Sequence, residues 1–424
     1  MLDYIKLDHV GPASTMEIDF GDRLTLITGD NGVGKTFALD LAWWALTRTW
    51  SGREAFPHRF KGVKPQIEYR VVGKTTNAKP VSVQYDFRQQ QWRLPARRPP
   101  MPGLVLYIRV DGSYSVWDPA RNYWKEARSM GVSNPDRPPA YHFDRRSIWD
   151  GLSIGDKVIC NGLIRDWVTW QLQKAEAFDQ LCSAIKMLSP TGVTLEPGPP
   201  VRISIDDARD IPTLSLPYGV VPITHASAGM RRVLGAAYLL VWAREEHRKA
   251  SELINQAPDN RLIVLFDEVE THLHPKWQRR IVPSLLKAAC TLGSDTLQCV
   301  ISTHSALVMA SVEPFFNDTQ DRILNMDMEG DQVIVNKVAW YKRGDADTWF
   351  TDEHIFDLSS THSTEAEQAI ERATAFMKTF GQGEPTPEQR EEAKAIEAAL
   401  ANVLSELDPY WRRWLHFVDV RGLQ

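Results

Sequence analysis

The sequence contains no apolar run of the roughly 18 residues that a membrane-spanning helix requires, so it predicts no contact with a membrane. Its first residues, MLDYIKLDHVG, lack the basic segment and apolar core of a secretory signal peptide, and none is expected. Cysteine is scarce, and no two cysteines form a C-x-x-C pair, which disfavours a zinc knuckle or a redox motif. The four cysteines are Cys160, Cys182, Cys290 and Cys299. Their scattered positions are typical of a reducing compartment, so we expect a cytoplasmic protein.

Neither sign of charge is in large excess. The chain of 424 residues has 49 Lys and Arg against 54 Asp and Glu, a formal net charge of -5. This balance disfavours a protein that is wholly wrapped on DNA, although it leaves room for a local basic groove. The length predicts about two or three structural units.

The pattern of apolar residues predicts a mixed α/β fold. An apolar run that ends at Thr28 predicts a strand, and a helix is expected from about Lys35 to Arg48. Between about 63 and 118, the runs IEYRVV, VSVQYDF, LVLYIRV and SYSVWD predict an antiparallel β patch. Residues 162–188 have helical spacing, LEPGPP is expected to end that helix, and VRISI and LSLPYGVVPI are interpreted as strands.

The second half of the chain continues this alternation. Residues 227–247 predict a helix, and the continuously apolar runs RLIVLFDE and LQCVISTHS predict buried strands. The segment KWQRRIVPSLLKAAC between them predicts another helix. After about residue 364, two charged helices are expected on either side of GQGEPTPEQR.

The stretch GDNGVGKT fits the phosphate-binding pattern G-x-x-x-x-G-K-[ST], and it stands between a predicted strand and a predicted helix. The matching residues are Gly29, Asp30, Asn31, Gly32, Val33, Gly34, Lys35 and Thr36. Glycines let the backbone turn tightly so that its N–H groups surround an anion, and the helix N-terminus adds a positive dipole end. Lys35 can reach the β- and γ-phosphates, and the Thr36 hydroxyl can ligate Mg²⁺. The alternative is a chance glycine turn, which the flanking strand and helix disfavour.

Two carboxylates follow the apolar run LIVLF. Asp267 and Glu268 stand at its C-terminal end, where ligands bind in parallel sheets. We expect Asp267 to hold Mg²⁺ through water and Glu268 to position or polarise the attacking water. His304 ends the next apolar strand, so it is expected beside the same site, where it can contact the γ-phosphate. A surface acidic pair and a structural histidine are the simpler alternatives.

A fourth element, HASAGMRRVLG, begins the helix that is predicted from residue 227. Ser227 and Gly229 lie at its expected N-terminus and are followed by Arg231 and Arg232. Small residues and free N–H groups at a helix start suit a phosphate that belongs to a second molecule. An ordinary N-capped helix is the alternative interpretation.

In this order, the four elements resemble the ATP-binding-cassette (ABC) ATPases of the SMC and RecF type. More narrowly, they resemble the AAA-labelled bacterial ATPases of anti-phage defence, such as the overcoming-lysogeny, Septu and retron-linked groups. The stretch DEVETHLHPKWQ is similar to that group's DE-P-E-x-x-LHP block, with Val269 where the group usually has proline. The segment FDLSSTHSTE, which starts at Phe356, resembles a pattern that follows the histidine in Septu-type ATPases.

The resemblance implies an α/β fold: an ABC-type P-loop NTPase head with a mixed core sheet, an antiparallel β patch, a helical insertion and a helical C-terminal tail. Segments 1–62 and 211–345 would form the two parts of the head. Segment 63–210 would hold the patch and the insertion, and segment 346–424 the tail.

The resemblance also implies self-association as a head-to-tail dimer or a higher oligomer. Two ATP molecules would lie between the P-loop of one subunit and Ser227 and Gly229 of the other. The family signature usually reads Ser-Gly-Gly-Gln or Ser-Gly-Gly-Glu, whereas this chain has SAGM. The contact across the dimer is therefore expected to be weaker or differently built. The sequence also lacks a long coiled-coil arm and the acidic cluster of a Toprim nuclease.

Roles at the site follow from the same resemblance. Thr36 and Asp267 would bind Mg²⁺, Glu268 would be the catalytic base, and His304 would sense the γ-phosphate of ATP. A glutamine is expected near Mg²⁺, and Gln66 is a candidate.

The favoured function is an ATP-hydrolysing dimeric switch in phage defence. Because the chain shows no nuclease motif, it would control a separate effector, such as an HNH nuclease or a toxin, through its nucleotide state. The tail helices at about 364–406 and the aromatic segment YWRRWLHF are candidate docking surfaces, with ordinary packing as the alternative.

Other functions are also open. A RecF-like or SMC-like repair ATPase would bind DNA, with Trp92, Arg93, Arg97 and Arg98 as the best basic and aromatic cluster. The long insertion before the signature speaks against a transporter subunit. The glutamate of the DE pair speaks against a scaffold without turnover. A metal site at His272 and His274 is disfavoured because residues two apart do not share a helix face.

Overall fold

The computed structural model describes residues 1–60, 62–73, 79–94, 101–123, 138–189, 192, 195–381 and 384–423. Arg97 and Arg98 of the basic cluster lie outside them. The chain divides into two compact units, Met1–Ala346 and Asp347–Gln424, and each is described by itself. Within the described ranges, no helix is both long enough and apolar enough to span a bilayer.

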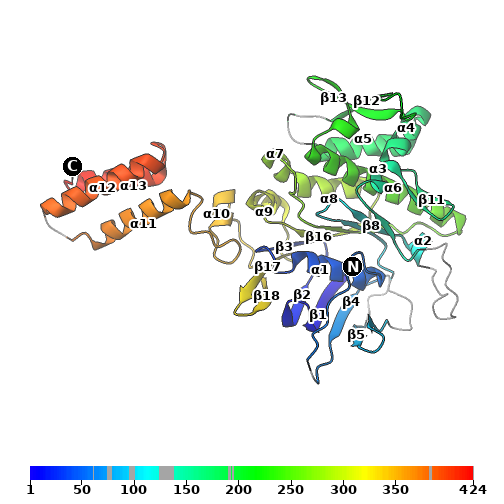
Figure 1. Ribbon diagram of the computed structural model, residues 1–424, viewed down its shortest axis with the longest axis horizontal. Helices are drawn as coiled ribbons and strands as arrows, with labels where there is room; N and C mark the ends of the chain where they lie inside the picture. Colours follow the sequence, from blue (N-terminus) through cyan, green and yellow to red (C-terminus); the bar gives the residue numbers. More distant parts are fainter. Residues whose placement is uncertain are drawn as a thin grey trace. The chain divides into compact units, whose positions relative to one another are not determined.

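In the described part of the first unit, an eight-stranded sheet has the order β18-β17-β3-β16-β15-β7-β8-β9 (Figure 1). Its strands are β3 (Leu24–Gly29), β7 (Leu104–Ile108), β8 (Tyr114–Trp117), β9 (Tyr141–Phe143), β15 (Arg261–Phe266), β16 (Thr296–Ser302), β17 (Asp321–Glu329) and β18 (Gln332–Lys337). The run β17-β3-β16-β15-β7 is parallel, and antiparallel strands extend the sheet on both sides. The carboxyl ends of β3, β15 and β16 therefore lie along one edge. This arrangement confirms the α/β fold with a mixed core sheet.

Both faces of the central sheet are covered, which explains why its inner strands are continuously apolar. Helices α6 (Ala228–Leu253) and α8 (Ile281–Thr291) contact β7 and β16, respectively. Helix α1 (Lys35–Thr47) contacts β3, β7, β15 and β16. Figure 1 shows α6 and α8 on one side of the sheet and the strands β1, β2 and β4 on the other.

A second sheet, antiparallel and ordered β2-β1-β4-β5-β6, packs over α1. Its strands are β1 (Leu2–Val10), β2 (Ala13–Asp19), β4 (Gln66–Val71), β5 (Val81–Asp86) and β6 (Gln91–Trp92). Because α1 lies between two sheets, most of its surface is apolar, and Trp43 and Trp44 are fully buried. Burying one tryptophan removes roughly 200 Å² from water, worth on the order of 5 kcal/mol before entropic costs. Packing therefore fixes the helix that follows the glycine-rich loop.

Two sequence predictions about strands were wrong. The runs LVLYIRV and SYSVWD were expected in the antiparallel patch, but β7 pairs in parallel with β15 and carries β8 into the central sheet. The run VRISI was expected to be a strand, but only its first residue belongs to β12 (Glu196–Val201), which is built mostly from the preceding LEPGPP. Strand β12 is at the edge of the sheet β12-β13-β14, where a proline without an N–H is tolerated.

The helical insertion also differs from its prediction. Residues 162–188 form two helices, α4 (Leu163–Gln173) and α5 (Glu176–Leu188), because Lys174 takes a left-handed backbone conformation with φ of 49°. The other elements of this unit are α2 (Pro119–Asn122), α3 (Ser147–Asp150), β10 (Leu152–Ile154), β11 (Lys157–Cys160), β13 (Ile211–Leu216), β14 (Gly219–Pro222), α7 (Pro275–Gln278) and α9 (Ala306–Val312).

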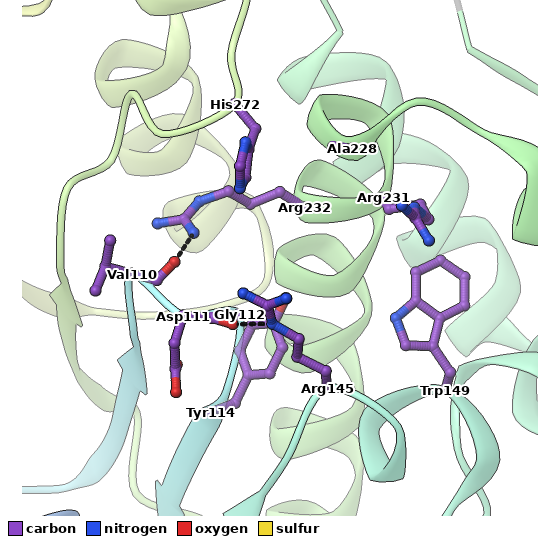
Figure 2. Close-up of a pocket in the computed structure, with 10 residues that line it drawn as sticks. All are labelled: Val110, Asp111, Gly112, Tyr114, Arg145, Trp149, Ala228, Arg231, Arg232 and His272. Carbon is purple, nitrogen blue, oxygen red and sulfur yellow. Dashed lines mark hydrogen bonds between the residues drawn. The ribbon is translucent and has the colours of Figure 1, made fainter.

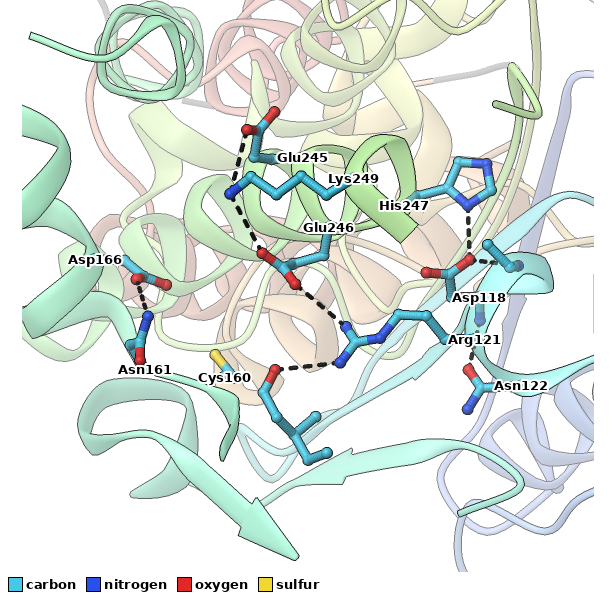
Figure 3. Close-up of polar contacts among 12 residues, drawn as sticks. Asp118, Arg121, Asn122, Cys160, Asn161, Asp166, Glu245, Glu246, His247 and Lys249 are labelled. Carbon is cyan, nitrogen blue, oxygen red and sulfur yellow. Dashed lines mark hydrogen bonds and ion pairs between the residues drawn. The ribbon is translucent and has the colours of Figure 1, made fainter. Parts of the chain in front are cut away.

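Buried polar contacts anchor α6 at two places along its length, and Figure 3 shows the one at His247 near its C-terminal end. His247 Nδ1 lies 2.6 Å from Asp118 Oδ1, and both side chains are buried. The N–H of Asp259 donates to the other ring nitrogen at 2.8 Å, so the proton of the neutral ring sits on Nδ1 and is donated to Asp118. Nearer the start of α6, the Tyr238 hydroxyl donates to Asp166 at 2.6 Å. Helix α6 is thus held against both the sheet and the insertion.

The second unit contains α11 (Thr364–Thr379), α12 (Pro387–Val403) and α13 (Pro409–Val420), after α10 (Ala346–Phe350) at the boundary. The sequence predicted two of these helices and missed α13. Phe376, Leu400 and Trp414 are buried in a shared core. The aromatic segment YWRRWLHF therefore contributes at least Trp414 to packing within this unit.

The four thiols should react in an order that follows their burial. Cys290 is exposed, whereas burial raises the pKa of Cys160 to about 12 and also raises that of the fully buried Cys299. Because the thiolate is the reactive form, we expect the disulfide reagent DTNB to modify Cys290 first in the native protein. Replacing Cys290→Ser should remove the fast phase. A Cys160 that reacts as fast as Cys290 would contradict the packing around α6.

Candidate nucleotide site

The glycine-rich loop from Gly29 to Thr36 joins β3 to α1. Gly29, Gly32 and Gly34 have φ of 133°, 86° and 100°, a left-handed region that side chains disfavour. A Cβ on Gly29 would also collide with the carbonyl oxygen of Met326 on β17. Glycine is therefore required at the start of the loop, and α1 begins at Lys35, directly after it.

The Lys35 side chain folds over this loop. Its Nζ donates to the carbonyl oxygens of Gly29 at 2.8 Å and Asp30 at 2.6 Å. Lys35 is buried, and burial lowers the pKa of its ammonium group, with nearby Glu268 acting in the opposite direction. These hydrogen-bond acceptors are neutral carbonyls, so the positive charge is available to a phosphate that enters the loop.

Thr36 and Asp267 meet at the strand edge although 231 positions separate them. The Thr36 hydroxyl donates to Asp267 Oδ2 at 2.8 Å, and Ser302 at the end of β16 donates to Oδ1 at 2.7 Å. Asp267 is fully buried, and burial raises the pKa of its carboxyl group, while hydrogen bonds from Ser302 and Thr36 oppose this shift. Nothing in the sequence pointed to Ser302 except its place before Thr303 and His304.

These oxygens fit Mg²⁺. The ion takes hard oxygen ligands and usually binds through one or two protein groups, with water and phosphates completing its shell. The Thr36 hydroxyl and the Asp267 carboxylate would supply the protein ligands. Among the described residues, no group of three or more His, Cys, Asp or Glu side chains is arranged to hold a metal without such help.

Glu268 lies beside Asp267 with an unusual backbone, at φ of 44°. Its N–H donates to Ser302 Oγ at 2.7 Å, and the Thr271 hydroxyl donates to its Oε2 at 3.2 Å. His304 Nε2 is 3.7 Å from Glu268 Oε1, and both side chains are about one-third exposed. A carboxylate and an imidazole therefore lie next to each other at this edge of the sheet.

Glu270 organises the loop that carries His304. Its carboxylate accepts the His304 N–H at 2.5 Å and the Thr303 hydroxyl at 2.8 Å. The sequence comparison with the DE-P-E-x-x-LHP block included Glu270 without giving it a role. The structure shows that it links the turn after β15 to the turn after β16.

Ser227 and Gly229 lie at the start of α6, where both make contacts within the fold. Ser227 is exposed and caps α6, with its hydroxyl accepting the Met230 N–H at 3.3 Å. Gly229 is buried, and a Cβ there would lie 2.6 Å from the carbonyl oxygen of His272. N-capping and close packing are therefore present at this helix start, and a nucleotide contact remains a proposal.

A cavity of about 180 Å³ lies beside the start of α6 (Figure 2). Its lining includes Ala228, Arg231, Arg145, Trp149 and His272. Most of its charged groups are cationic, although Asp111 also lines it. An anion in this cavity would lie near the positive end of the α6 dipole and near several cationic side chains.

Two sequence-based candidates lie elsewhere. Gln66 begins β4 in the second sheet, where its side chain accepts from Gln84 at 3.5 Å, so no contact supports a role near Mg²⁺. Trp92 is buried against Trp44 and Tyr85, and Arg93 pairs with Asp86 at 2.8 Å. Packing and an ion pair thus account for the described half of the basic cluster.

Known proteins are similar to parts of this chain. Residues 4–116 match the family model "AAA domain", and residues 217–310 match "AAA domain, putative AbiEii toxin, Type IV TA system". The Retron Vc95 probable ATPase of Vibrio cholerae serotype O1 biovar El Tor is 41% identical over 64 residues, covering 14% of this chain and 12% of the relative. The Retron Ec83 probable ATPase of Escherichia coli is 39% identical over 51 residues, covering 12% of this chain and 8% of the relative. The chain thus spans about a tenth of the length of these curated relatives.

Solved structures include the SMC head domain from Thermotoga maritima, with a TM-score of 0.40, 15% identity, and coverage of 80% of this chain and 99% of that one. The RecF recombination mediator has a TM-score of 0.39, 12% identity, and coverage of 80% and 98%. The two AAA matches cover the segments that contain the glycine-rich loop, the Asp267–Glu268 pair and His304. With the geometry of these groups, the matches identify the chain as an AAA-labelled ATPase.

Proposed function

We propose that this chain binds ATP with Mg²⁺ and hydrolyses it at the edge formed by β3, β15 and β16. The observation that supports this most directly is the hydrogen bond from Thr36 to Asp267, with Glu268 next in the chain. It joins the hydroxyl of the phosphate-binding loop to the carboxylate of the second strand. These are the two protein groups that hold Mg²⁺ in P-loop ATPases.

Each side chain has a distinct part in the proposed reaction. Lys35 would exchange its carbonyl partners for phosphate oxygens and offset their negative charge. Bound Mg²⁺ would neutralise charge on the β- and γ-phosphates. Glu268 would orient a water molecule and accept its proton as the water attacks the γ-phosphate. His304, 3.7 Å from Glu268, would donate to a γ-phosphate oxygen.

We propose that the other half of the site comes from a second copy of the chain. Ser227 and Ala228 are exposed at the start of a 26-residue helix, so the first N–H groups of α6 are accessible to an anion. The adjacent cations would reinforce the helix dipole. A head-to-tail dimer would bring this surface to the nucleotide that the partner's loop holds.

The broader role that we propose is a cytoplasmic switch in phage defence that controls a separate nuclease or toxin. The retron names of the partial relatives support this direction. The second unit, with its helices α11 to α13, is the proposed contact for the effector. The DNA-repair alternative has less support, because Trp92 and Arg93 of its basic cluster are used within the fold.

Mixing two inactive variants tests the composite site. Ser227→Asp retains an N-cap but places a negative charge where the phosphate held by the partner would approach. Lys35→Ala removes the lysine of the glycine-rich loop that would bind the phosphates. Each variant alone should hydrolyse ATP slowly. An equal mixture should recover about a quarter of the wild-type rate, because half of random dimers are mixed and each mixed dimer has one intact site of two.

Ser227→Asn is the matched control, since it caps the helix without adding a charge, and it should retain most activity. A mixture with no more activity than its components would contradict the shared site. The ATPase rate per subunit should also fall when the protein is diluted until the dimer dissociates. A rate per subunit that stays constant during this dilution would contradict the shared site as well.

A further inference from the structure

We infer that Arg232 is a positioning residue that holds the backbone of Glu268 and ties it to the start of α6. This inference rests on the proposed role of Glu268 in ATP hydrolysis. The sequence suggested that Arg231 and Arg232 could both serve a phosphate. The structure separates them, because Arg231 is exposed and Arg232 is buried.

The Arg232 guanidinium binds the ends of two neighbouring strands, and Figure 2 shows its contact with Val110 after β7. Its Nη2 donates to the carbonyl oxygens of Asp267 at 2.8 Å and Glu268 at 3.0 Å, after β15. Its Nη1 donates to those of Val110 at 3.1 Å and Arg109 at 3.3 Å, after β7. The guanidinium carbon also lies 5.2 Å from the centre of the Phe266 ring. One side chain on α6 therefore fixes the peptide units that flank the proposed metal ligand and the proposed base.

The backbone at Glu268 needs such support. Its φ of 44° is in the left-handed region, which costs energy for a residue with a side chain. That conformation sets the direction of the Glu268 side chain, and the hydrogen bond from Arg232 to the Glu268 carbonyl oxygen holds it from one side. The Ser302 hydroxyl holds the N–H of the same residue from the other side.

A second contact joins the same two elements. Gly229 on the first turn of α6 packs against the turn after β15, where a Cβ would come within 2.6 Å of the His272 carbonyl oxygen. Arg232 therefore forms hydrogen bonds with one end of the segment from Asp267 to His272, and Gly229 packs against the other end. A nucleotide held by the partner subunit would contact Ser227 at the start of α6, the helix that positions Glu268 through Arg232. Nucleotide binding at one site of a dimer would therefore affect the position of Glu268 at the other site.

Arginine suits this task because its planar fork offers parallel donors to several acceptors at once, whereas an ammonium group is a single point. Lysine at position 232 would keep the charge but could not donate hydrogen bonds to the carbonyl oxygens at both strand ends. We therefore expect Arg232→Lys to be partly active and Arg232→Gln to be worse.

The test compares ATP turnover, ATP affinity and melting temperature in purified full-length variants. Arg232→Gln should lower kcat about 10-fold to 100-fold, the range for displaced or unsupported reacting groups, and should change KM and ATP affinity by less than about twofold. Arg232→Lys should lie between wild type and Arg232→Gln. Adding Arg232→Gln to Glu268→Gln should cause little further loss, because Arg232 acts through Glu268.

Arg244→Gln is the matched control. Arg244 lies on the same helix and donates to the backbone carbonyl oxygens of Asp259, Leu292 and Gly293, away from the Glu268 turn. We expect it to lower the melting temperature about as much as Arg232→Gln while keeping kcat. Equal losses of kcat in both variants would mean general destabilisation and would overturn the inference.

Three further results separate the inference from the function on which it rests. If Glu268→Gln keeps the wild-type rate, the proposed role of Glu268 as the base fails, and the inference about Arg232 fails with it. If Glu268→Gln is inactive but Arg232→Gln keeps its kcat, only the positioning role fails. If Arg232→Gln does not fold, Arg232→Lys decides, and a wild-type kcat in that variant overturns the inference.

Discussion

Replacing Glu268 by glutamine should lower kcat for ATP by about 100-fold or more, the scale of a lost general base, and should leave ATP binding intact. Glutamine matches the size of glutamate and can still accept the Thr271 hydrogen bond that is present at 3.2 Å. Its amide cannot take up a proton from water, so the attacking water would no longer be activated. Phosphate release under saturating ATP measures the rate, and a fluorescent nucleotide measures binding.

Glu329→Gln is a suitable control for this experiment, because Glu329 is an exposed glutamate at the end of β17. It should keep the wild-type rate. Equal rates for Glu268→Gln and wild type would show that Glu268 is not the base. The chain would then be a nucleotide-binding protein whose turnover, if any, has another origin.

Replacing Lys35 by alanine should weaken ATP binding by about 100-fold or more, because two charge-assisted hydrogen bonds of roughly 1.5 kcal/mol or more each would be lost. The loop would also lose its only direct cation near the phosphates among residues 29–36, all of which the structure describes. The carbonyl oxygens of Gly29 and Asp30 would lose the donor that they have now. Titration calorimetry with ATP and Mg²⁺ measures this change directly.

Two comparisons make the Lys35→Ala result interpretable. Lys337→Ala removes an exposed lysine at the end of β18 and should bind ATP normally. A melting temperature close to that of wild type would show that the loop variant is folded. Unchanged ATP affinity in a folded Lys35→Ala protein would mean that the glycine-rich loop is not the nucleotide site.

The sequence predicted the elements around the loop well because their signals are local. A short, continuous apolar run that ends in Asp267 and Glu268 predicts a covered strand with polar groups at its end. The same holds for the run before His304 and for the one before Gly29. Parallel pairing of β3, β16 and β15 then places these ends along one edge.

The sequence patterns failed where long-range partners decide the structure. The run LVLYIRV is equally apolar in an antiparallel patch and in a parallel sheet, and only its pairing with β15 makes it part of the core. The break between α4 and α5 depends on one left-handed residue, Lys174, which no periodicity indicates. Strands β17 and β18 were not predicted, yet β17 packs against the loop at Gly29.

By itself, the sequence determined that a glycine-rich loop, a carboxylate pair and a histidine would each follow a strand of one α/β sheet. Only the tertiary structure decided which side chains reach these groups from elsewhere. Arg231 and Arg232 are the same residue type in adjacent positions, but about 100° of helix rotation separates them. That rotation leaves one in solvent and directs the other to the carbonyl oxygen of Glu268. The direction depends on how α6 packs against the sheet, and this packing is a property of the whole fold.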